Sequence, residues 1–398
     1  MKILVLNCRI YSIEYEIFDM PSEKELCKGV LDHIGFEQSI LVHTANNKTD
    51  RFVQPVSDYE KGLDLIFSTI TSPMHGCLKS KNEISAIGHR IVHGGGTFTS
   101  SIFIDENVKN EIYKDFEIAP LHNPYNLKGI EAIEAFLPNK KSVGVFDTSF
   151  HQTIPEFAFR YALPERLYQD YKIRKYGFHG IFHKYAAETV AHILKKKNVN
   201  MISFHLGAGS SVCAIKNGKS VDTSMGFTPL EGLVMTDRPG DMDVGIVLYL
   251  LRRGWTLTEL EPCLNRESGT YGISGISSTM EGVVTEAKKG DKKSQLAIDI
   301  FVYRARKYLG SYWFVLEGNV DAIAFSGGIG ENSPLIREKI LHGFDKFGIV
   351  IDHKMNMHSI NSERKINTKG SKVKVFTLPR NAKVLIARET YQIVTKHK

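Results

Sequence analysis

The chain has 398 residues, of which 42% are hydrophobic and 24% are charged. That length fits two or three domains, and this ordinary globular composition excludes disordered, collagen-like and coiled-coil classes. The 51 basic residues exceed the 44 acidic ones by only 7. Lysine-rich runs such as Lys195–Lys197 carry no interleaved aromatic residues, so we expect solvated surfaces and no nucleic-acid partner.

The five cysteines are scattered and include no Cys-x-x-Cys pair. They indicate neither a zinc ribbon nor a disulfide framework, and they favour a reducing compartment. No apolar stretch approaches the roughly 18 residues of a membrane span, and the apolar run at residues 3–6 is too short for a signal sequence. We therefore expect a cytoplasmic protein with no membrane partner.

Short apolar runs alternate with longer amphipathic ones along the chain. Strands are predicted at residues 3–6, 84–92, 143–146 and 322–325, and helices at 125–136, 183–197, 296–316 and 334–343. The helix over 183–197 is expected to end in three lysines, which suit the negative end of a helix dipole. The alternation predicts an α/β architecture.

Two distant segments share one pattern. Residues 2–19 read as strand, turn, strand, and residues 201–224 read the same way around a Gly/Ser turn. This echo predicts a duplicated two-domain fold. A domain boundary is expected near Asp147–Pro155, after the strand VGVFD.

Three glycine-rich segments are suited to hold phosphate, because glycine lets backbone N–H groups converge on an anion. The first is Gly207–Ser211, whose alternative interpretation is an ordinary hairpin turn. The second is Ser326–Asn332, a glycine turn expected to open onto a helix N-terminus, with a plain strand–helix connection as the alternative. The third, His93–Gly96, is almost as well explained as a flexible loop.

Polar residues at strand ends form a second group of candidates. Arg90 lies inside an apolar strand and needs an anionic partner, either an internal carboxylate or a ligand. Asp147 closes the strand VGVFD, a usual place for functional residues in α/β sheets, although it could instead cap a turn. His122, His179 and Arg238 lie in polar loops, where a lone histidine is more often structural.

Together these segments resemble the acetate kinases, within the acetate and sugar kinase/Hsc70/actin superfamily. The resemblance runs from end to end. It rests on ILVLNC (3–8), GHRIVHGG (88–95), APLHNP (119–124), VGVFDTSFHQTIP (143–155), RKYGFHG (174–180), HLGAGSS (205–211), DTSMGFTPLEGLVM (222–235), SGGIGEN (326–332) and IARET (386–390).

The resemblance implies reversible phosphoryl transfer between ATP and a short carboxylate such as acetate, giving acetyl phosphate and ADP. It implies two domains of duplicated actin-like (ribonuclease H-like) topology with a central cleft. We place the first domain at residues 1–147 plus 384–398 and the second at 148–383. Mg²⁺ and a homodimer are also implied.

Site residues carry over from the matching motifs. By resemblance, Arg90 and Arg238 flank the transferring phosphoryl group, His179 hydrogen-bonds it with His122 nearby, and Asp147 serves the in-line arrangement. The remaining sets are an acyl pocket of Val92, Leu121, Phe178 and Pro229, a nucleotide site of Gly207, Gly209, Ser210, Gly328, Ile329 and Asn332, and a metal site of Asn7 and Asp147. Val92 matches the acetate version of the pocket, although one methylene gives little discrimination.

The chain departs from the family pattern on the nucleotide side. After Asn7 the family has Gly-Ser-Ser-Ser and then Leu-Lys, whereas residues 9–14 here read RIYSIE, so Glu14 replaces a lysine. Arg9 is close in sequence and could stand in for the missing lysine, but on a strand its parity is opposite to that of position 14, which does not favour this compensation. The family's Asn-Glu-Glu before the last helix reads Asn381-Ala382-Lys383.

Two further departures fall on nucleotide contacts. Ala208 replaces an asparagine, and the family's Asp-x-Arg reads Thr279-Met280-Glu281. Because ATP carries several negative charges, acids at 14 and 281 are expected to slow an ATP-dependent reaction. Three interpretations follow: an acetate kinase, an impaired paralogue that binds a carboxylate or acyl phosphate as a sensor, or an acyl kinase that uses another donor such as pyrophosphate.

Overall fold

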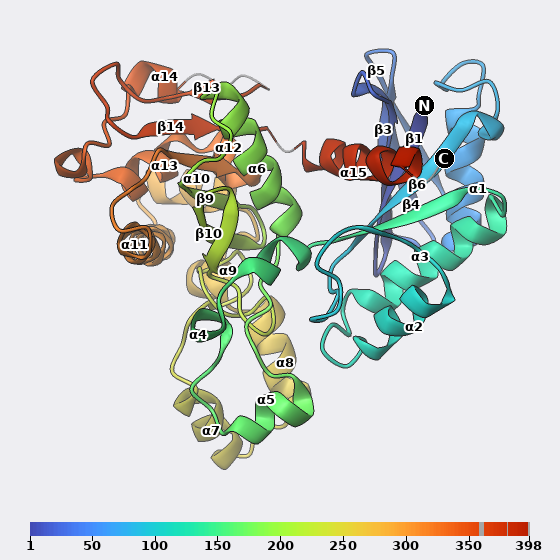
Figure 1. Ribbon diagram of the computed structural model, residues 1–398. Helices are drawn as coiled ribbons and strands as arrows, with labels where there is room; N and C mark the ends of the chain where they lie inside the picture. The colour runs from blue at the N-terminus through green and yellow to red at the C-terminus, as the bar shows by residue number, and fades with distance from the viewer. Residues whose placement is uncertain (358–361, 380, 397–398) are drawn as a thin grey trace. The chain divides into compact units, whose positions relative to one another are not determined.

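A computed structural model describes residues 1–357, 362–379 and 381–396. The chain divides into two compact units, which Figure 1 shows coloured along the sequence. Unit 1 comprises residues 1–150 and 381–398, and unit 2 comprises residues 151–380. Each unit has its own sheet and its own hydrophobic core.

Unit 1 is built on an eight-stranded sheet in the order β5-β4-β3-β2-β1-β6-β8-β7. Its strands are β1 (Lys2–Arg9), β2 (Ser12–Asp19), β3 (Lys24–Asp32), β4 (Ser39–Ala45), β5 (Lys48–Gln54), β6 (Ile84–Ile91), β7 (Ile102–Phe103) and β8 (Lys141–Phe146). Its α-helices are α1 (Tyr59–Ile70), α2 (Glu106–Lys114), α3 (Asn123–Phe136) and α15 (Ala382–Lys396), and a short 3₁₀ turn covers Lys81–Glu83. Strands β1 to β5 pair antiparallel in succession, whereas β1, β6 and β8 run parallel.

The central strands of unit 1 are apolar on both faces because helices cover both. On β1, Leu4 and Leu6 belong to the core that also contains residues of α1 and α3. The alternate residues point to the opposite face, where α15 packs on β1 and β6. Gly88 of β6 allows this close approach, because a Cβ there would lie 2.4 Å from Thr390 Oγ1 of α15.

Unit 2 contains a six-stranded sheet in the order β11-β10-β9-β12-β14-β13. Its strands are β9 (Met201–Leu206), β10 (Ser210–Lys216), β11 (Lys219–Thr223), β12 (Ala322–Ser326), β13 (Arg364–Lys365) and β14 (Lys374–Thr377). Its longer helices are α6 (Gly180–Ile193), α7 (Gly245–Arg252), α8 (Leu257–Arg266), α10 (Met280–Lys288), α11 (Lys292–Val315) and α13 (Pro334–Leu341). The shorter ones are α4 (Glu156–Phe159), α5 (Glu165–Tyr171), α9 (Gly269–Ser274), α12 (Gly327–Asn332) and α14 (His353–Met357), with 3₁₀ turns at Ser149–Thr153 and Asp345–Phe347.

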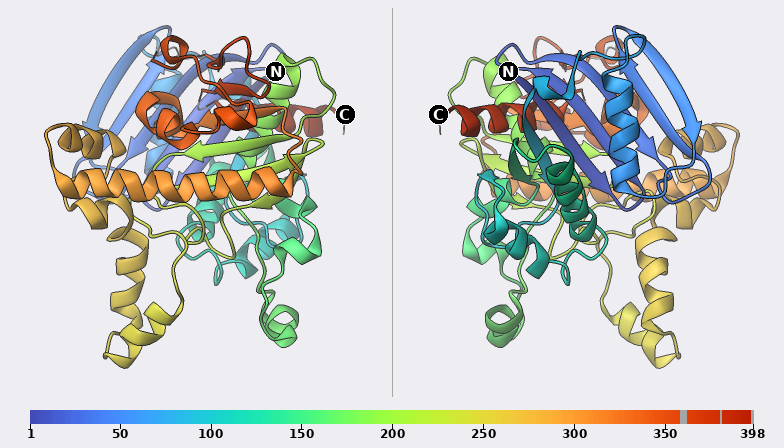
Figure 2. Two further views of the ribbon diagram at one scale, coloured as in Figure 1. Left: turned by 90° about the vertical axis from the view of Figure 1, so that its left-hand side faces the viewer. Right: turned by 90° about the vertical axis from the view of Figure 1, so that its right-hand side faces the viewer.

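The long helix α11 crosses one face of the unit 2 sheet, as Figure 2 shows. Its apolar residues share a core with Phe204 and Leu206 of β9 and Val212 of β10. The alternate residues of β9, including Ser203 and His205, are also buried, and α6 packs on β9 and β12. A polar stripe of the sheet therefore lies under α6.

The two sheets repeat one arrangement, which confirms the predicted duplication and the α/β class. In both, three antiparallel strands are followed by two parallel ones: β3-β2-β1-β6-β8 and β11-β10-β9-β12-β14. Residues 201–224 hold three strands, however, and not two. The second turn is made by Asn217 and Gly218, whose φ angles of 51° and 75° suit a tight hairpin.

Two local predictions are wrong. The predicted helix over 183–197 is α6, which begins earlier and ends at Ile193, so the three lysines lie beyond it. It stops because Lys195 takes φ 53° and the Lys196 N–H donates to the Ala191 carbonyl, a typical C-terminal cap. The glycine turn predicted at 326–332 is itself helical, as α12.

The cysteines are free thiols. Among the described residues, no helix combines the length and the apolar character that crossing a bilayer requires.

Candidate active site

In unit 1, three predicted site residues meet at the carboxyl ends of neighbouring parallel strands. Asn7 lies near the end of β1, Arg90 near the end of β6, and Asp147 directly after β8. The parallel register of β1 with β6, and of β6 with β8, brings these ends to one edge of the sheet. This edge is where open α/β sheets usually bind ligands.

Arg90 and Asp147 form a buried ion pair. The structure thus supplies the internal carboxylate that the sequence required for Arg90. Burial alone would lower the pKa of Arg90, but the adjacent Asp147 carboxylate outweighs it and raises that pKa. Arg90 Nη1 also donates to Asn7 Oδ1 at 3.4 Å, so the three strand ends are joined by polar contacts.

Glu14 extends this group onto β2, where it is paired directly with Asn7 of β1. Its carboxylate accepts a hydrogen bond from Asn7 Nδ2 at 3.2 Å and lies 2.8 Å from Arg9 Nη2 and 3.4 Å from Lys383 Nζ. Burial opposes ionisation of Glu14, yet Arg9 and Lys383 outweigh burial and lower its pKa to about 2. Glu14 is therefore a firmly held carboxylate.

The parity argument against Arg9 as a partner of position 14 is wrong. It treated the two residues as one strand, but they lie on two strands of a hairpin that pairs Arg9 with Ser12 and Asn7 with Glu14. Residues 7, 9, 12 and 14 therefore share one face. Lys383 is a second, unforeseen partner, so the acid at 14 and the lysine at 383 compensate each other.

Two asparagines of α3 hold the strand ends, and the sequence analysis missed both. Asn126 accepts from the Val92 N–H at 3.0 Å and donates to the Cys8 carbonyl at 2.8 Å. Asn123 accepts from the His93 N–H at 3.1 Å and donates to its carbonyl at 3.0 Å. Asn123 and Asn126 are three residues apart, which places them on one side of a helix directly after His122. This spacing could have identified them as a pair from the sequence.

In unit 2, His179 lies in a hydrogen-bonded chain of histidines and serines. His179 precedes α6 with φ 58°. Ser211 Oγ lies 2.9 Å from His179 Nδ1 and 2.8 Å from His183 Nε2, while Ser203 Oγ lies 3.0 Å from His183 Nδ1. Burial lowers the pKa of His183 well below its usual value, so this chain is uncharged at its buried end.

Arg238 and His179 converge over one glycine. A Cβ built at Gly209 would lie 3.4 Å from Arg238 Nη2 and 3.4 Å from His179 Cε1. Arg238 Nη1 donates to the Pro229 carbonyl at 3.1 Å, and burial lowers the pKa of Arg238. Both candidate catalytic side chains therefore face the same side of the turn between β9 and β10.

The Gly207–Ser211 segment is the β9–β10 turn. The Gly207 N–H donates to the Gly209 carbonyl at 3.1 Å, and the Ser210 hydroxyl donates to the Gly207 carbonyl at 3.1 Å. The Ser210 hydroxyl thus donates within the turn, and the Ser211 hydroxyl lies between nitrogens of His179 and His183. The carbonyl of the exposed Ala208 accepts from the Thr236 hydroxyl.

The predicted nucleotide residues Gly328, Ile329 and Asn332 lie on α12. Gly327 begins this helix with φ 79°, and a Cβ there would lie 2.4 Å from the Leu206 carbonyl oxygen, so β12 passes into α12 without a loop. Asn332 Nδ2 donates to the Gly328 carbonyl at 3.0 Å.

The acyl-pocket candidates are divided between the units. Val92 is buried and Leu121 is exposed in unit 1, whereas Phe178 is buried and Pro229 is half-buried in unit 2. His122 is half-buried directly before α3. Val92 directly follows β6, and Leu121 and His122 precede α3. Phe178 precedes His179, and the Pro229 carbonyl accepts from Arg238.

The remaining departures differ in exposure. Thr279 and Glu281 are exposed at the start of α10, where Thr279 caps the helix by accepting from the Gly282 N–H. Ala382 is buried in the first turn of α15, next to Lys383. The side chain at 382 therefore contributes packing in place of a carboxylate.

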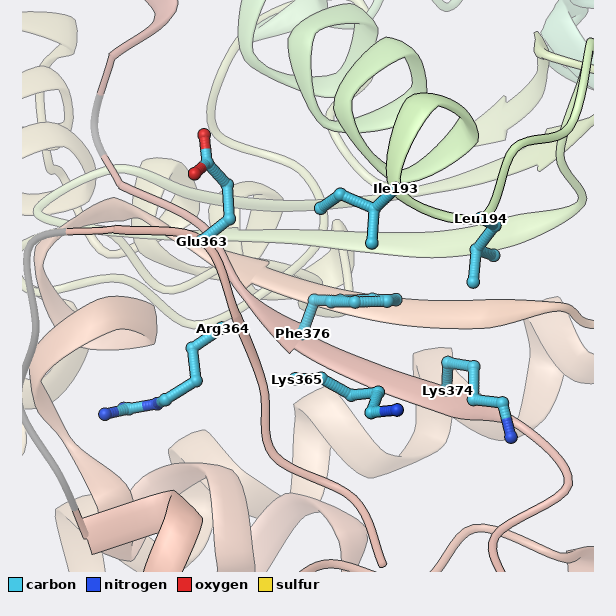
Figure 3. A pocket seen from close by; sticks show the side chains of 7 residues that line it. All are labelled: Ile193, Leu194, Glu363, Arg364, Lys365, Lys374 and Phe376. Carbon is cyan, nitrogen blue, oxygen red and sulfur yellow. The ribbon is translucent and has the colours of Figure 1, made fainter. Parts of the chain in front are cut away.

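A pocket in unit 2 does not coincide with these residues. Figure 3 shows this pocket, of about 380 Å³, with Ile193 and Leu194 at the end of α6 opposite Phe376 of β14. His179 stands at the other end of α6, roughly 20 Å away along a helix of this length. The pocket thus has no part in the site defined by His179 and Arg238.

The five shared strands of each sheet follow the order 3-2-1-4-5 when they are numbered along the chain within their unit. This duplicated sheet, with arginine and histidine side chains at strand ends and turns, defines the class of actin-like folds. An acetate kinase from Porphyromonas gingivalis has this fold with a TM-score of 0.93 and 38% identity, covering 99% of both chains. A propionate kinase from Francisella tularensis gives a TM-score of 0.91 and 38% identity, covering 98% of this chain and 99% of that one.

Sequence similarity narrows the class to one family. The Acetokinase family matches residues 2–388. An acetate kinase from Caldicellulosiruptor saccharolyticus is 47% identical over 400 aligned residues, covering 100% of both chains. The chain belongs to the acetokinase family, as its motifs predicted.

Proposed function

We propose that this protein is an acetate kinase that transfers a phosphoryl group reversibly between ATP and acetate, giving acetyl phosphate and ADP. The observation that carries the proposal is the full-length family match, within which the residues predicted for the carboxylate and the phosphoryl group are all retained. The compensated charges of Glu14 and Lys383 remove a main reason for proposing an impaired paralogue or another donor.

In the proposed mechanism, the protein positions and neutralises charge and forms no covalent intermediate. Arg90, fixed by Asp147, binds a carboxylate or phosphoryl oxygen. His179 and Arg238, which face the open side of Gly209, donate to the oxygens of the phosphoryl group as it passes from one oxygen to the other. Ser211 orients the His179 ring by holding its Nδ1.

Mg²⁺ and ATP are the cofactor and donor that we infer from the family. Asp147 Oδ1 is buried and has no hydrogen-bond partner among the described residues, which suits a hard cation. Asn7 is the neighbouring oxygen donor. Mg²⁺ usually takes one or two protein oxygens and fills its other positions with phosphates and water, so this small donor set fits. When bound, the ion neutralises phosphate charge.

The acyl preference that we propose is acetate, on the basis of Val92. The side chain is buried beside the end of β6, and its N–H is bound by Asn126, so its position is fixed. A methylene in such a pocket changes the free energy by about 1–3 kcal/mol. We therefore expect propionate to react as well, about 10- to 100-fold less efficiently.

We further infer a homodimer and a cytoplasmic location. Helix α7 exposes Ile246, Leu248, Tyr249 and Leu251, a set that a second copy could cover. The free cysteines suit a reducing compartment. Sedimentation of the purified protein tests the dimer, and substitution of Leu248 by Glu is expected to shift the protein toward the monomer.

The function is tested by following acyl phosphate as its hydroxamate, with acetate or propionate and with ATP, GTP or pyrophosphate, each with Mg²⁺. We expect turnover with acetate and ATP at ordinary kinase rates of about 1–100 s⁻¹. The Arg238→Ala protein is the matched control for the site. Turnover with pyrophosphate alone, or acetyl phosphate binding without turnover, would contradict the proposal.

A further inference from the structure

A continuous set of polar contacts connects α15 with Arg90 in unit 1. Lys383 Nζ lies 3.4 Å from Glu14 Oε2, and Glu14 Oε2 accepts from Asn7 Nδ2 at 3.2 Å. Asn7 Oδ1 in turn accepts from Arg90 Nη1 at 3.4 Å. Arg90 completes the path by its ion pair with Asp147.

The charges at both ends of Asn7 fix its amide orientation. The amino group of Asn7 faces a carboxylate, and its carbonyl oxygen faces a guanidinium. Rotating the amide by half a turn would place the oxygen against Glu14 and the amino group against Arg90, and both contacts would be repulsive. Asn7 is also almost fully buried, so water cannot easily replace either partner.

Lys383 is set among acidic side chains. Besides Glu14, it lies 3.8 Å from Glu16 Oε2, and the two acids occupy alternate positions on one face of β2. Arg9 holds the other oxygen of Glu14 at 2.8 Å. A lysine at 14 alone would meet two cations and the Asn7 amino group, and an acid at 383 alone would add a third acidic side chain next to Glu14 and Glu16.

We propose that Glu14 and Lys383 are a reciprocal charge pair that positions Asn7 and, through it, Arg90 for phosphoryl transfer. The pair requires opposite charges at the two positions, and a change of one member alone breaks it. This is the arrangement expected when an acid and a base have exchanged places relative to the family pattern. The effect on catalysis rests on the proposed function. The interaction between the charges at positions 14 and 383 does not.

The test is a double-mutant cycle on the full-length protein with Glu14→Lys, Lys383→Glu and the two combined. We expect each single reversal to lower kcat/KM for acetate about 10- to 100-fold, the size of coupling between contacting charges. The double variant is expected to recover only part of this loss, because it restores an opposite pair between positions 14 and 383 while Arg9 and the Asn7 amino group still face a lysine.

Two further variants distinguish positioning from a merely structural role. Glu14→Gln keeps an acceptor for Asn7 Nδ2, so we expect it to raise KM for acetate less than Glu14→Lys does. Reversal of Glu111 and Lys114, an exposed ion pair on α2 at 2.6 Å, is the matched control and should leave the kinetics unchanged. Thermal unfolding of every variant shows whether it is folded.

Additive losses in a folded double variant would overturn the proposal. If the double variant does not fold, the neutral pair Glu14→Gln with Lys383→Gln replaces it. If this neutral pair loses as much kcat/KM as Lys383→Glu alone, the proposal is overturned as well. A wild type that makes no acyl phosphate contradicts the proposed function only. In that case the cycle is measured on the free energy of unfolding, where the same non-additivity is expected.

Discussion

The two units hold their candidate catalytic residues by different physical means. In unit 1 the side chains around Arg90 form ion pairs, with Asp147, Glu14 and Lys383 contributing full charges. In unit 2 the hydrogen-bonded chain that starts at His179 is neutral at its buried end, because Ser211 joins His179 to His183, whose pKa burial keeps low.

This difference explains where the sequence can vary. An ion pair is satisfied by either polarity, so a network of ion pairs accepts paired exchange of charge. A buried hydroxyl between two imidazoles has no such alternative, since each nitrogen must find a donor or an acceptor of matching type. We therefore attribute the departures near position 14 to exchange, and expect the histidine–serine chain to be intolerant of change.

The largest effect is expected from Arg90→Ala. It would leave the Asp147 carboxylate buried without its cation, which costs about 3–5 kcal/mol of unfolding free energy, in addition to the loss of activity. Arg238→Ala should lower kcat/KM about 100- to 1,000-fold but cost only about 1–2 kcal/mol of stability, because it loses a hydrogen bond to a carbonyl and a partly exposed ion pair with Asp237.

Urea unfolding and the hydroxamate assay measure the two quantities on the same preparations. Equal stabilities for the two arginine variants would remove the distinction between the units.

A smaller effect is expected from Ser211→Ala. It removes the hydroxyl shared by His179 and His183, so we expect a loss of about 1–3 kcal/mol in stability and roughly tenfold in kcat, with KM little changed. Ser203→Ala is the control, because it affects only His183. A kcat loss as large in the control would show that His179 is not oriented through Ser211.

The pH dependence of stability should separate the units. Burial lowers the pKa of His151 to about 4, so as pH falls below 6.5 the unfolded chain binds this proton first and stability is lost. Burial raises the pKa of Glu16 to about 8, so this acid stays protonated in the fold and stability is gained as pH falls.

Between pH 6.5 and pH 5, each group therefore contributes on the order of 2 kcal/mol, with opposite signs. His151→Gln should lose less stability than the wild type over this range, and Glu16→Gln should lose more. Urea titrations at both pH values measure the change in unfolding free energy. If this change shifts in the same direction from the wild type in both variants, the opposite contributions of His151 and Glu16 are refuted.

The smallest effect is expected from Glu281→Arg. The side chain is exposed, so solvent screens its charge. Restoring the cation of the family should lower KM for ATP by about threefold or less, consistent with exposed charges, and leave kcat unchanged. The effect should vanish at high salt, and a change in kcat would indicate a role beyond attraction of the nucleotide.

Much of the fold and part of the site were predictable from local sequence. Apolar runs of strand length located β1, β6, β8 and β12, and polar residues at their ends indicated Arg90 and Asp147. These inferences succeed because a strand end and its neighbouring loop are adjacent in sequence.

What the sequence could not indicate depends on contacts between distant residues. Lys383 meets Glu14 because α15 packs across β1 and β6, and no periodicity relates those positions. The α12 segment was interpreted as a turn because glycines dominate it, whereas its contact with Leu206 requires glycine at a helix start.

The packing of α15 on Gly88 has a consequence for synthesis of the protein. Unit 1 needs residues 381–396 to cover β1 and β6, yet these residues leave the ribosome only after all of unit 2 has been made. At about 5–20 residues per second, the β1–β6 surface waits on the order of 10–50 s for its covering helix. During that interval the first sheet is exposed on one face, and unit 2 can fold before unit 1 is complete.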